Sequence, residues 1–200
     1  MEERHVVLSS IATIDAGLSF RSRVEDSATG SLKIVQQKDL SEDTATVDTT
    51  NLYTISPPPR LDLAKYGLKD GDIIIRTRGN KPLATIVRDL PGTAIAAAPL
   101  VRVRISSEAV LADYLVWFLN SQKAAEYFVR NAKGSGVKLI DKATIAGISI
   151  PALSMGRQNA IAEVFMLANT EFMLSQSLSK RHRQLREDQI NMIANGVEYD

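Results

Sequence analysis

The stretch "RQNAIAEVFMLANTEFMLSQSLSKRHRQLREDQINMI", residues 157–193, decides the fold because it contains neither Gly nor Pro. Apolar residues recur along it in an approximate heptad, interrupted by Glu171, Arg181 and Asp188. The apolar positions are Val164, Leu167, Leu174, Leu178, Leu185 and Met192. The pattern predicts a single helix of roughly 55 Å, with Ser154 as its N-cap. Since a small domain is narrower than this, we expect the helix to protrude and to pack its apolar seam on another helix.

The residues upstream of this helix predict a small basic loop and two shorter helices. In "KGSGVKLIDKATIAGISIP", residues 133–151, a Gly-Ser-Gly loop precedes a short strand that ends at Pro151. Helical spacing of apolar residues appears in 108–121 and again in 123–132. We expect Tyr114, Trp117 and Phe118 to lie in the core rather than to stack on nucleic-acid bases.

Strand patterns dominate the first half of the chain. Strands are expected in 32–40, 72–76, 83–89 and 99–105, whereas 8–17 predicts a short helix or turn that ends at Gly17. The last strand alternates Val101 and Val103 with Arg102 and Arg104, which predicts one buried face and one basic face. The fold class is therefore α+β, with a mixed β domain in 1–152 and a long helix in 153–200.

The bulk composition excludes several classes of protein. The 200 residues carry a net charge of +1, contain no cysteine and have two histidines at opposite ends, so neither disulfides nor a zinc site is expected. No apolar run reaches transmembrane length and the first ten residues do not form a secretion signal, so we expect a cytoplasmic protein with no membrane partner. Bases outnumber acids in 61–104 and in 130–142. This excess fits either contact with a polyanion or an ordinary solvated face.

Motifs of enzyme chemistry are mostly missing from the sequence. There is no glycine-rich phosphate loop, no dinucleotide-binding loop and no acidic residue followed two positions later by Lys. "SPPP" at 56–59 resembles the motif of amino-methylating enzymes, but Pro59 stands where an aromatic ring would stack on a flipped base. We therefore assign no catalytic residue and no metal ligand.

Five blocks in order resemble the specificity subunit of a type I restriction–modification system. They are "LSSIATIDAGLSF" (8–20), "IVQQKDL" (34–40), "YGLKDGDIIIRTRGN" (66–80), "LADYLVWFLNS" (111–121) and "GSGVKLIDKATIAGISIPALSMGRQNAIAEVF" (134–165). Such subunits usually carry two target-recognition domains and two spacer helices, whereas this chain has one of each and resembles a half-subunit. Arg157 also stands where the family often has an acid before Gln158.

The resemblance implies a division of labour between this chain and its partners. The target-recognition domain in 1–152 would read double-stranded DNA. The helix in 153–200 would pair as an antiparallel coiled coil through Leu167, Leu174, Leu178 and Leu185 and hold the methyltransferase (modification) subunits, alongside a restriction subunit. S-adenosylmethionine, ATP and magnesium would serve those partners, so this chain would bind no cofactor and would not be an enzyme.

The second helix could come from an identical chain, giving a homodimer, or from a different half-subunit. An alternative is a helical interaction protein that binds methyltransferase subunits without reading DNA.

Candidate DNA contacts are Arg, Lys, Gln, Asn and Ser side chains on expected loops, which suit base edges and phosphates. They are Arg21, Arg23, Gln36, Gln37, Lys38, Arg76, Arg78, Asn80, Lys81, Lys133, Ser135 and Lys138.

Reversing the charges of Arg78 and Lys81 together is expected to abolish DNA binding, because both lie in the loop "RTRGNK" that should project at the duplex. Lys138→Ala should instead weaken binding to all sequences alike, as expected of a phosphate contact. Electrophoretic mobility shifts measure both effects, and a double variant that binds like the wild type would place the DNA on another face.

Overall fold

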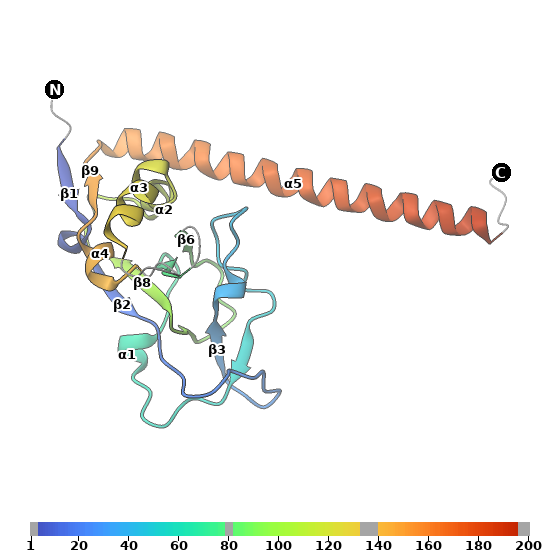
Figure 1. The fold of residues 1–200 in the computed structure, drawn as a ribbon, viewed down its shortest axis with the longest axis horizontal. Coiled ribbons are helices and arrows are strands. Elements are labelled where there is room, and N and C mark those ends of the chain that lie inside the picture. The colour runs from blue at the N-terminus through green and yellow to red at the C-terminus, as the bar shows by residue number, and fades with distance from the viewer. Residues whose placement is uncertain (1–3, 79–81, 133–139, 196–200) are drawn as a thin grey trace.

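The computed structural model describes residues 4–78, 82–132 and 140–195, and it has the expected α+β class. Figure 1 shows a body of strands and short helices from which one long helix projects to one side. The strands are β1 (His5–Val7), β2 (Ala12–Ala16), β3 (Leu32–Val35), β4 (Tyr53–Ile55), β5 (Ile73–Arg76), β6 (Leu83–Ile86), β7 (Ala94–Ala96), β8 (Leu100–Ile105) and β9 (Ser149–Pro151). The helices are η1 (Leu8–Ser10), η2 (Gln37–Asp39), α1 (Leu63–Tyr66), α2 (Ala112–Leu119), α3 (Gln122–Asn131), α4 (Lys142–Ala146) and α5 (Met155–Ala194).

Three sheets organise the domain. The largest is antiparallel, in the order β2-β8-β5-β6, and a second sheet has the order β4-β3-β7 with β3 and β7 parallel. A third, two-stranded sheet pairs Val6 of β1 with Ile150 of β9. This last pairing ties the start of the domain to the segment that leads into α5, so the entry point of the long helix is fixed.

The main core lies between the four-stranded sheet and helices α2 and α3. Tyr114 and Phe118 are buried there with strand residues such as Ile73 and Val103, which confirms their expected place in the core. Trp117 is half-buried, and its ring lies 5.7 Å from that of Tyr114. The side chain of Asn120 makes two hydrogen bonds to the backbone of Ala84 in edge strand β6, so the helical layer is also held to the sheet by polar contacts.

The expectation of a helix or turn over 8–17 was only partly right. A single 3-10 turn, η1, is followed by strand β2, which pairs with β8 along its whole length. The burial of Ala12 and Ile14 alternates with the exposure of Thr13, which is the two-residue period of a strand. In so short a stretch, the sequence alone does not distinguish the two-residue period of a strand from the 3.6-residue period of a helix.

Helix α5 confirms the expected long, protruding helix. Ser154 occupies the N-cap position, but its side chain makes no capping hydrogen bond. The polar contacts of the helix with the body end where Asn169 Nδ2 donates to Thr44 O at 3.2 Å, and every residue from Thr170 to Ala194 is exposed. This free part is about 37 Å long. The seam residues Leu167, Leu174, Leu178 and Leu185 are between 56% and 63% exposed and lack a partner among the described residues.

Gln158 in the first turns of α5 fixes the helix to the body. Its side chain is fully buried, and Oε1 accepts a hydrogen bond from Leu111 N at 2.9 Å. Nε2 donates to Ala109 O at 2.8 Å and to Leu153 O at 2.9 Å. One amide therefore satisfies three backbone groups from two separate segments.

Gln158→Ala should destabilise the chain by about 3 kcal/mol, because it leaves those three backbone groups without their partner. Urea unfolding followed by circular dichroism measures this. The matched control is Gln122→Ala on the exposed side of α3, which should change stability by less than about 0.5 kcal/mol. Equal effects of the two substitutions would contradict the role given to Gln158.

Candidate nucleic-acid interface

The expected basic face on β8 is not a free surface. The side chain of Arg102 is only 7% exposed, and it bonds Asp15 at 2.7 Å and Gly67 O at 2.8 Å. Arg104 forms two hydrogen bonds to the carboxylate of Asp72, at 2.7 and 2.6 Å, and its pKa is raised chiefly by this hydrogen bonding. The prediction of a basic face was wrong because both arginines neutralise acids from neighbouring segments.

Two further bases of the segment 61–104 also have acidic partners. Arg76, at the end of β5, bonds Glu42 at 2.6 Å, and Arg88 bonds Asp113 at 2.5 Å. Part of the basic charge counted from the sequence in 61–104 is therefore neutralised within the domain. The DNA contact predicted for Arg76 stays a prediction, and in this structure it competes with the Glu42 pair.

A groove with a volume of about 390 Å³ lies between three segments that are far apart in the sequence. Its lining residues are Phe20, Ser22, Val24, Gln36, Gln37, Lys38, Ala97, Ala98 and Pro99. Gly17 allows the first segment to approach, because a Cβ at this position would lie 2.7 Å from Ala96 O. Backbone hydrogen bonds from Leu18 N to Ala96 O and from Ala98 N to Leu18 O, both 2.8 Å, then hold the two walls together.

Two glutamine residues that line this groove, Gln36 and Gln37, carry amide nitrogens that are not used in hydrogen bonds among the described residues. The amide nitrogens Nε2 of Gln36 and Gln37 are buried, and neither has a hydrogen-bond partner among the described residues. A buried donor without a partner costs free energy, which an acceptor within hydrogen-bond reach of either nitrogen would recover. Lys38 adds a positive charge, with Nζ 3.1 Å from the centre of the Tyr53 ring.

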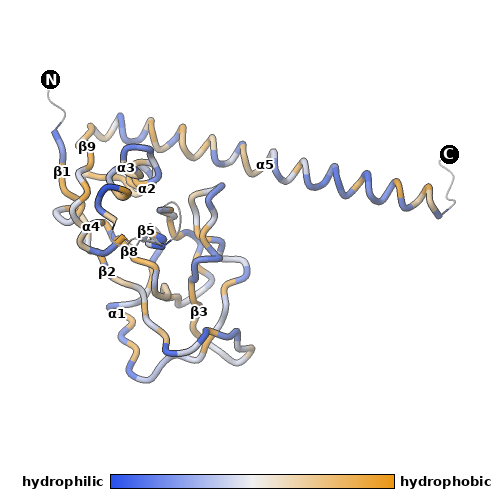
Figure 2. The backbone as a smooth tube through the Cα atoms, viewed as in Figure 1, coloured by the Kyte–Doolittle hydropathy of each residue, from blue (hydrophilic) through white to orange (hydrophobic). Residues whose placement is uncertain are grey.

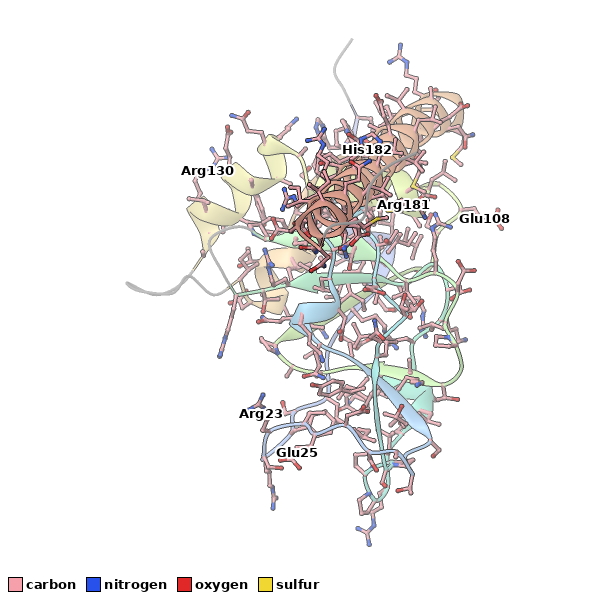
Figure 3. The ribbon with its side chains drawn as sticks, turned by 90° about the vertical axis from the view of Figure 1, so that its right-hand side faces the viewer. Arg23, Glu25, Glu108, Arg130, Arg181 and His182 are labelled. Atoms are coloured by element: carbon pink, nitrogen blue, oxygen red, sulfur yellow. The ribbon has the colours of Figure 1, made fainter. Side chains whose placement is uncertain are left out.

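Some of the sequence-predicted contacts lie at or beside this groove, which Gln36, Gln37 and Lys38 line. Arg21 and Arg23 are exposed on the segment that forms one wall, and Figure 3 shows Arg23 projecting from the end of the domain remote from α5. Thr77 Oγ1 donates to Pro99 O at 2.6 Å and Ile140 N donates to Thr77 O at 3.1 Å. The described residues that flank both predicted loops therefore lie beside the groove.

The predicted residues within those loops cannot be placed. Asn80, Lys81, Lys133, Ser135 and Lys138 lie outside the described residues. Arg78 is described; it is exposed, and no hydrogen bond or ion pair joins it to another residue in the described ranges.

Sequence reasoning missed the wall formed by Ala97, Ala98 and Pro99. These residues carry no charge, and they meet the glutamines only because β7 pairs in parallel with β3. Nothing local in the sequence indicates a parallel pairing across about 60 residues of chain.

Asp39 holds the turn that presents the glutamines. Its carboxylate accepts a hydrogen bond from Gln36 N at 2.7 Å while being only 7% exposed. Burial raises the pKa of Asp39 above its ordinary 3.8, against the opposing effects of the Gln36 hydrogen bond and of Lys38.

Among the described residues, no three histidine or acidic side chains gather as they would around a metal ion. No helix in the described ranges combines the length and the apolar character that a membrane crossing requires.

The raised pKa of Asp39 predicts a pH-dependent stability. Below pH 3.8 the carboxyl is protonated in both states, and its contribution to stability falls as pH rises through the raised pKa, since the folded state holds the proton more tightly. Asp39→Asn should remove this dependence while keeping an acceptor for Gln36 N. Urea unfolding between about pH 4 and 8 gives the stability of each variant. Asp39→Ala is the control: it loses the acceptor for Gln36 N, so it should lower the free energy of unfolding by about 1 kcal/mol at every pH. A stability difference between Asn and Asp that does not grow with pH would contradict the assignment.

Comparison with solved structures gives one architecture, whereas the comparisons of sequence find no match. No protein-family model matches the chain, and no curated protein sequence matches it either. Among solved structures, an HsdS subunit from Thermoanaerobacter tengcongensis matches with a TM-score of 0.61 at 14% identity, over 98% of this chain and 45% of that one. A type I restriction–modification S subunit from M. genitalium matches with a TM-score of 0.60 at 13% identity, over 94% and 45%.

A third match comes from a structure that describes complex assembly and conformational transition of a type I restriction–modification system. Its TM-score is 0.64 at 15% identity, over 98% of this chain and 46% of that chain. The chain thus spans less than half the length of each of these proteins. The order of strands, the helical layer and α5 together give this chain the fold of one half of a type I restriction–modification S subunit.

Proposed function

We propose that this chain is a DNA sequence-recognition half-subunit of a type I restriction–modification system. The observation that carries the proposal is the groove lined by Gln36 and Gln37, whose buried amide nitrogens have no hydrogen-bond partner among the described residues. Support also comes from the half-length fold likeness to S subunits.

The chemistry of the groove suits the edges of DNA bases. Purine N7 and O6 and thymine O4 are acceptors in the major groove, and Gln side chains are common readers of such edges. Phe20 and Pro99 provide apolar contact of the kind that a thymine methyl group takes. Arg21 and Arg23, which are exposed beside the groove, suit phosphates and would fix the register of the domain on the duplex.

The fold likeness suggests a role for the long helix in assembly. Under this proposal α5 is a spacer that pairs with a second spacer helix and holds methyltransferase subunits, with a restriction subunit in the complete system. Methyl transfer from S-adenosylmethionine and ATP- and magnesium-dependent cleavage belong to those partners, in the cytoplasm, and this chain is not itself an enzyme. Two identical chains would read an interrupted palindrome, because a two-fold axis presents the same domain to both half-sites.

A second candidate is an interaction protein that binds methyltransferase subunits without reading DNA. The internal ion pairs of Arg76, Arg88, Arg102 and Arg104 favour it, because they remove much of the basic surface expected from the sequence. A DNA-binding measurement separates the two candidates.

DNA binding should depend steeply on salt, and Arg21→Ala with Arg23→Ala should reduce the slope of log K against log salt by about two, since each arginine meets a phosphate. Fluorescence anisotropy of a mixed-sequence duplex at several salt concentrations measures this slope. The matched control replaces two exposed bases at the α5 end of the domain, Lys123→Ala with Arg157→Ala, and should leave the slope unchanged. A wild-type chain that binds no duplex at low salt would favour the interaction protein instead.

A further inference from the structure

The free part of α5 carries a cluster of bases that are not neutralised within the chain. The stretch "KRHRQLR", residues 180–186, contains Lys180, Arg181, Arg183 and Arg186, and all four are exposed. No ion pair joins any of them to another residue in the described ranges. The arginines of the domain that pair with Glu42, Asp113, Asp15 and Asp72 differ from them in this respect.

The neighbouring residues of the helix strengthen this positive charge. Residues 172–186 contain no Asp or Glu, and Figure 2 shows the hydrophilic stretch of α5 toward its free end. The acid that follows soon after, Asp188, accepts a hydrogen bond from Gln184 Nε2 at 3.0 Å. The unpaired positive charge that β8 lacks is therefore present on the long helix.

Helical geometry places two of these bases on the side of α5 that faces the domain. Residues eighteen positions apart lie nearly in line along an α-helix, because eighteen residues make about five turns of 3.6 residues. Ala162 is buried and Phe165 packs against the main core, so they mark this side, called here the body side. Lys180 lies in line with Ala162, and Arg183 lies in line with Phe165.

The leucine seam lies on the opposite side of the helix. At about 100° per residue, Leu185 is roughly 140° from Lys180 and roughly 160° from Arg183 around the helix axis. Arg181 is only about 40° from Leu185 and belongs to the seam side. A helix packed on the leucine seam would therefore leave Lys180 and Arg183 accessible.

The side chains beside these bases suit an anion. A hollow on the surface of α5 is lined by Ser175, Leu178, Ser179, His182, Arg183 and Arg186. Arginine guanidinium groups and serine hydroxyls are among the side-chain groups that most often contact phosphate oxygens in protein–DNA complexes. The hollow thus combines two unpaired cations with two hydroxyl groups.

We infer that Lys180, Arg183 and Arg186 contact backbone phosphates of the DNA between two half-sites. This inference rests on the DNA recognition and the spacer role proposed above, and it adds a second DNA-contacting surface outside the recognition domain. Figure 1 shows the domain on one side of α5. A duplex read by two such domains, one at each end of the spacer, runs along the helix on that same side and faces the body side of α5.

The position of the bases along the helix assigns them to the DNA between the half-sites. Lys180 lies roughly 16 Å and Arg186 roughly 26 Å beyond Asn169, which makes the last polar contact with the body. This offset is about half to three quarters of a turn of B-DNA. The duplex carries about one negative charge per 1.7 Å, so the contact needs no particular sequence and adds affinity without reading bases.

An acidic protein surface is the competing partner for these bases. The location on the body side favours DNA, because a protein seated there would occupy the path between the two recognition domains. The salt dependence of DNA binding decides between the two partners.

Arg183→Ala should reduce the slope of log K against log salt by about one, and Lys180→Ala with Arg183→Ala by about two, since each base meets a phosphate. Fluorescence anisotropy of a mixed-sequence duplex of about 40 base pairs, roughly four helical turns, measures the slope. Arg181→Ala is the matched control, because it removes the same charge two residues away on the seam side. It should leave the slope unchanged, and circular dichroism confirms that each variant is folded.

Crosslinking locates the contact directly. The chain contains no cysteine, so an introduced thiol is labelled at a single position. Ser179→Cys lies in the hollow, whereas Ser177→Cys lies about 200° away around the helix axis. With a short photoactivatable label on the thiol, the Ser179→Cys chain should crosslink to the duplex and the Ser177→Cys chain should not. Equal yields from the two positions, or a higher yield from Ser177→Cys, would overturn the inference.

The salt slopes also separate this inference from the proposed recognition groove. If Arg21→Ala with Arg23→Ala lowers the slope but Lys180→Ala with Arg183→Ala does not, the inference is overturned and the bases of α5 serve an acidic protein instead. If only the α5 variant lowers the slope, the inference is supported and the phosphate contacts proposed for Arg21 and Arg23 are wrong. A wild-type chain that binds no duplex at low salt would overturn both.

Discussion

The buried amide of Gln158 is the contact on which the geometry of the molecule depends. It joins the first turns of α5 to Ala109 and Leu111 before α2 and to Leu153 before α5. A helix that is free over about 37 Å acts as a lever, so a small rotation at its base becomes a large displacement at its tip. The antiparallel pairing of β1 with β9 restrains the same region from the other side. A spacer can set the distance between two recognition domains only if its base is held in this way.

The arginines of the domain divide into a structural set and an available set. Arg102 and Arg104 both reach Gly67 O and hold Asp15 and Asp72 in place, which stabilises the junction between the large sheet and α1. The available set includes Arg21, Arg23 and Arg78, whose side chains are exposed. The structural set is held in internal ion pairs, so the proposed recognition of bases draws on the neutral donors of Gln36 and Gln37. In the proposed function these groups would distinguish one DNA sequence from another, whereas phosphate contacts would mainly add affinity.

The sequence predicted those elements whose pattern of residues is local and extends over many positions. It did not predict features that depend on contacts between residues far apart in the chain. The heptad of α5 runs over many turns, so its length and exposure followed directly from it. Asp72 was predicted as the first residue of a strand, but its pairing with Arg104 depends on β5 lying beside β8, which no nearby residue specifies. Residues 12–16 were misread because five residues do not separate a two-residue period from a helical one. The groove was missed as a unit because Pro99 and Gln36 meet through a parallel pairing of β3 with β7.

The most direct test of the central claim is selection of duplexes by the purified wild-type chain from a random-sequence pool, followed by sequencing of the bound fraction. The account predicts one enriched motif, an interrupted palindrome whose identical half-sites lie on the order of one to two helical turns apart. A single undivided site, two unrelated half-sites, or a bound fraction with no enriched motif would contradict recognition by two identical paired copies.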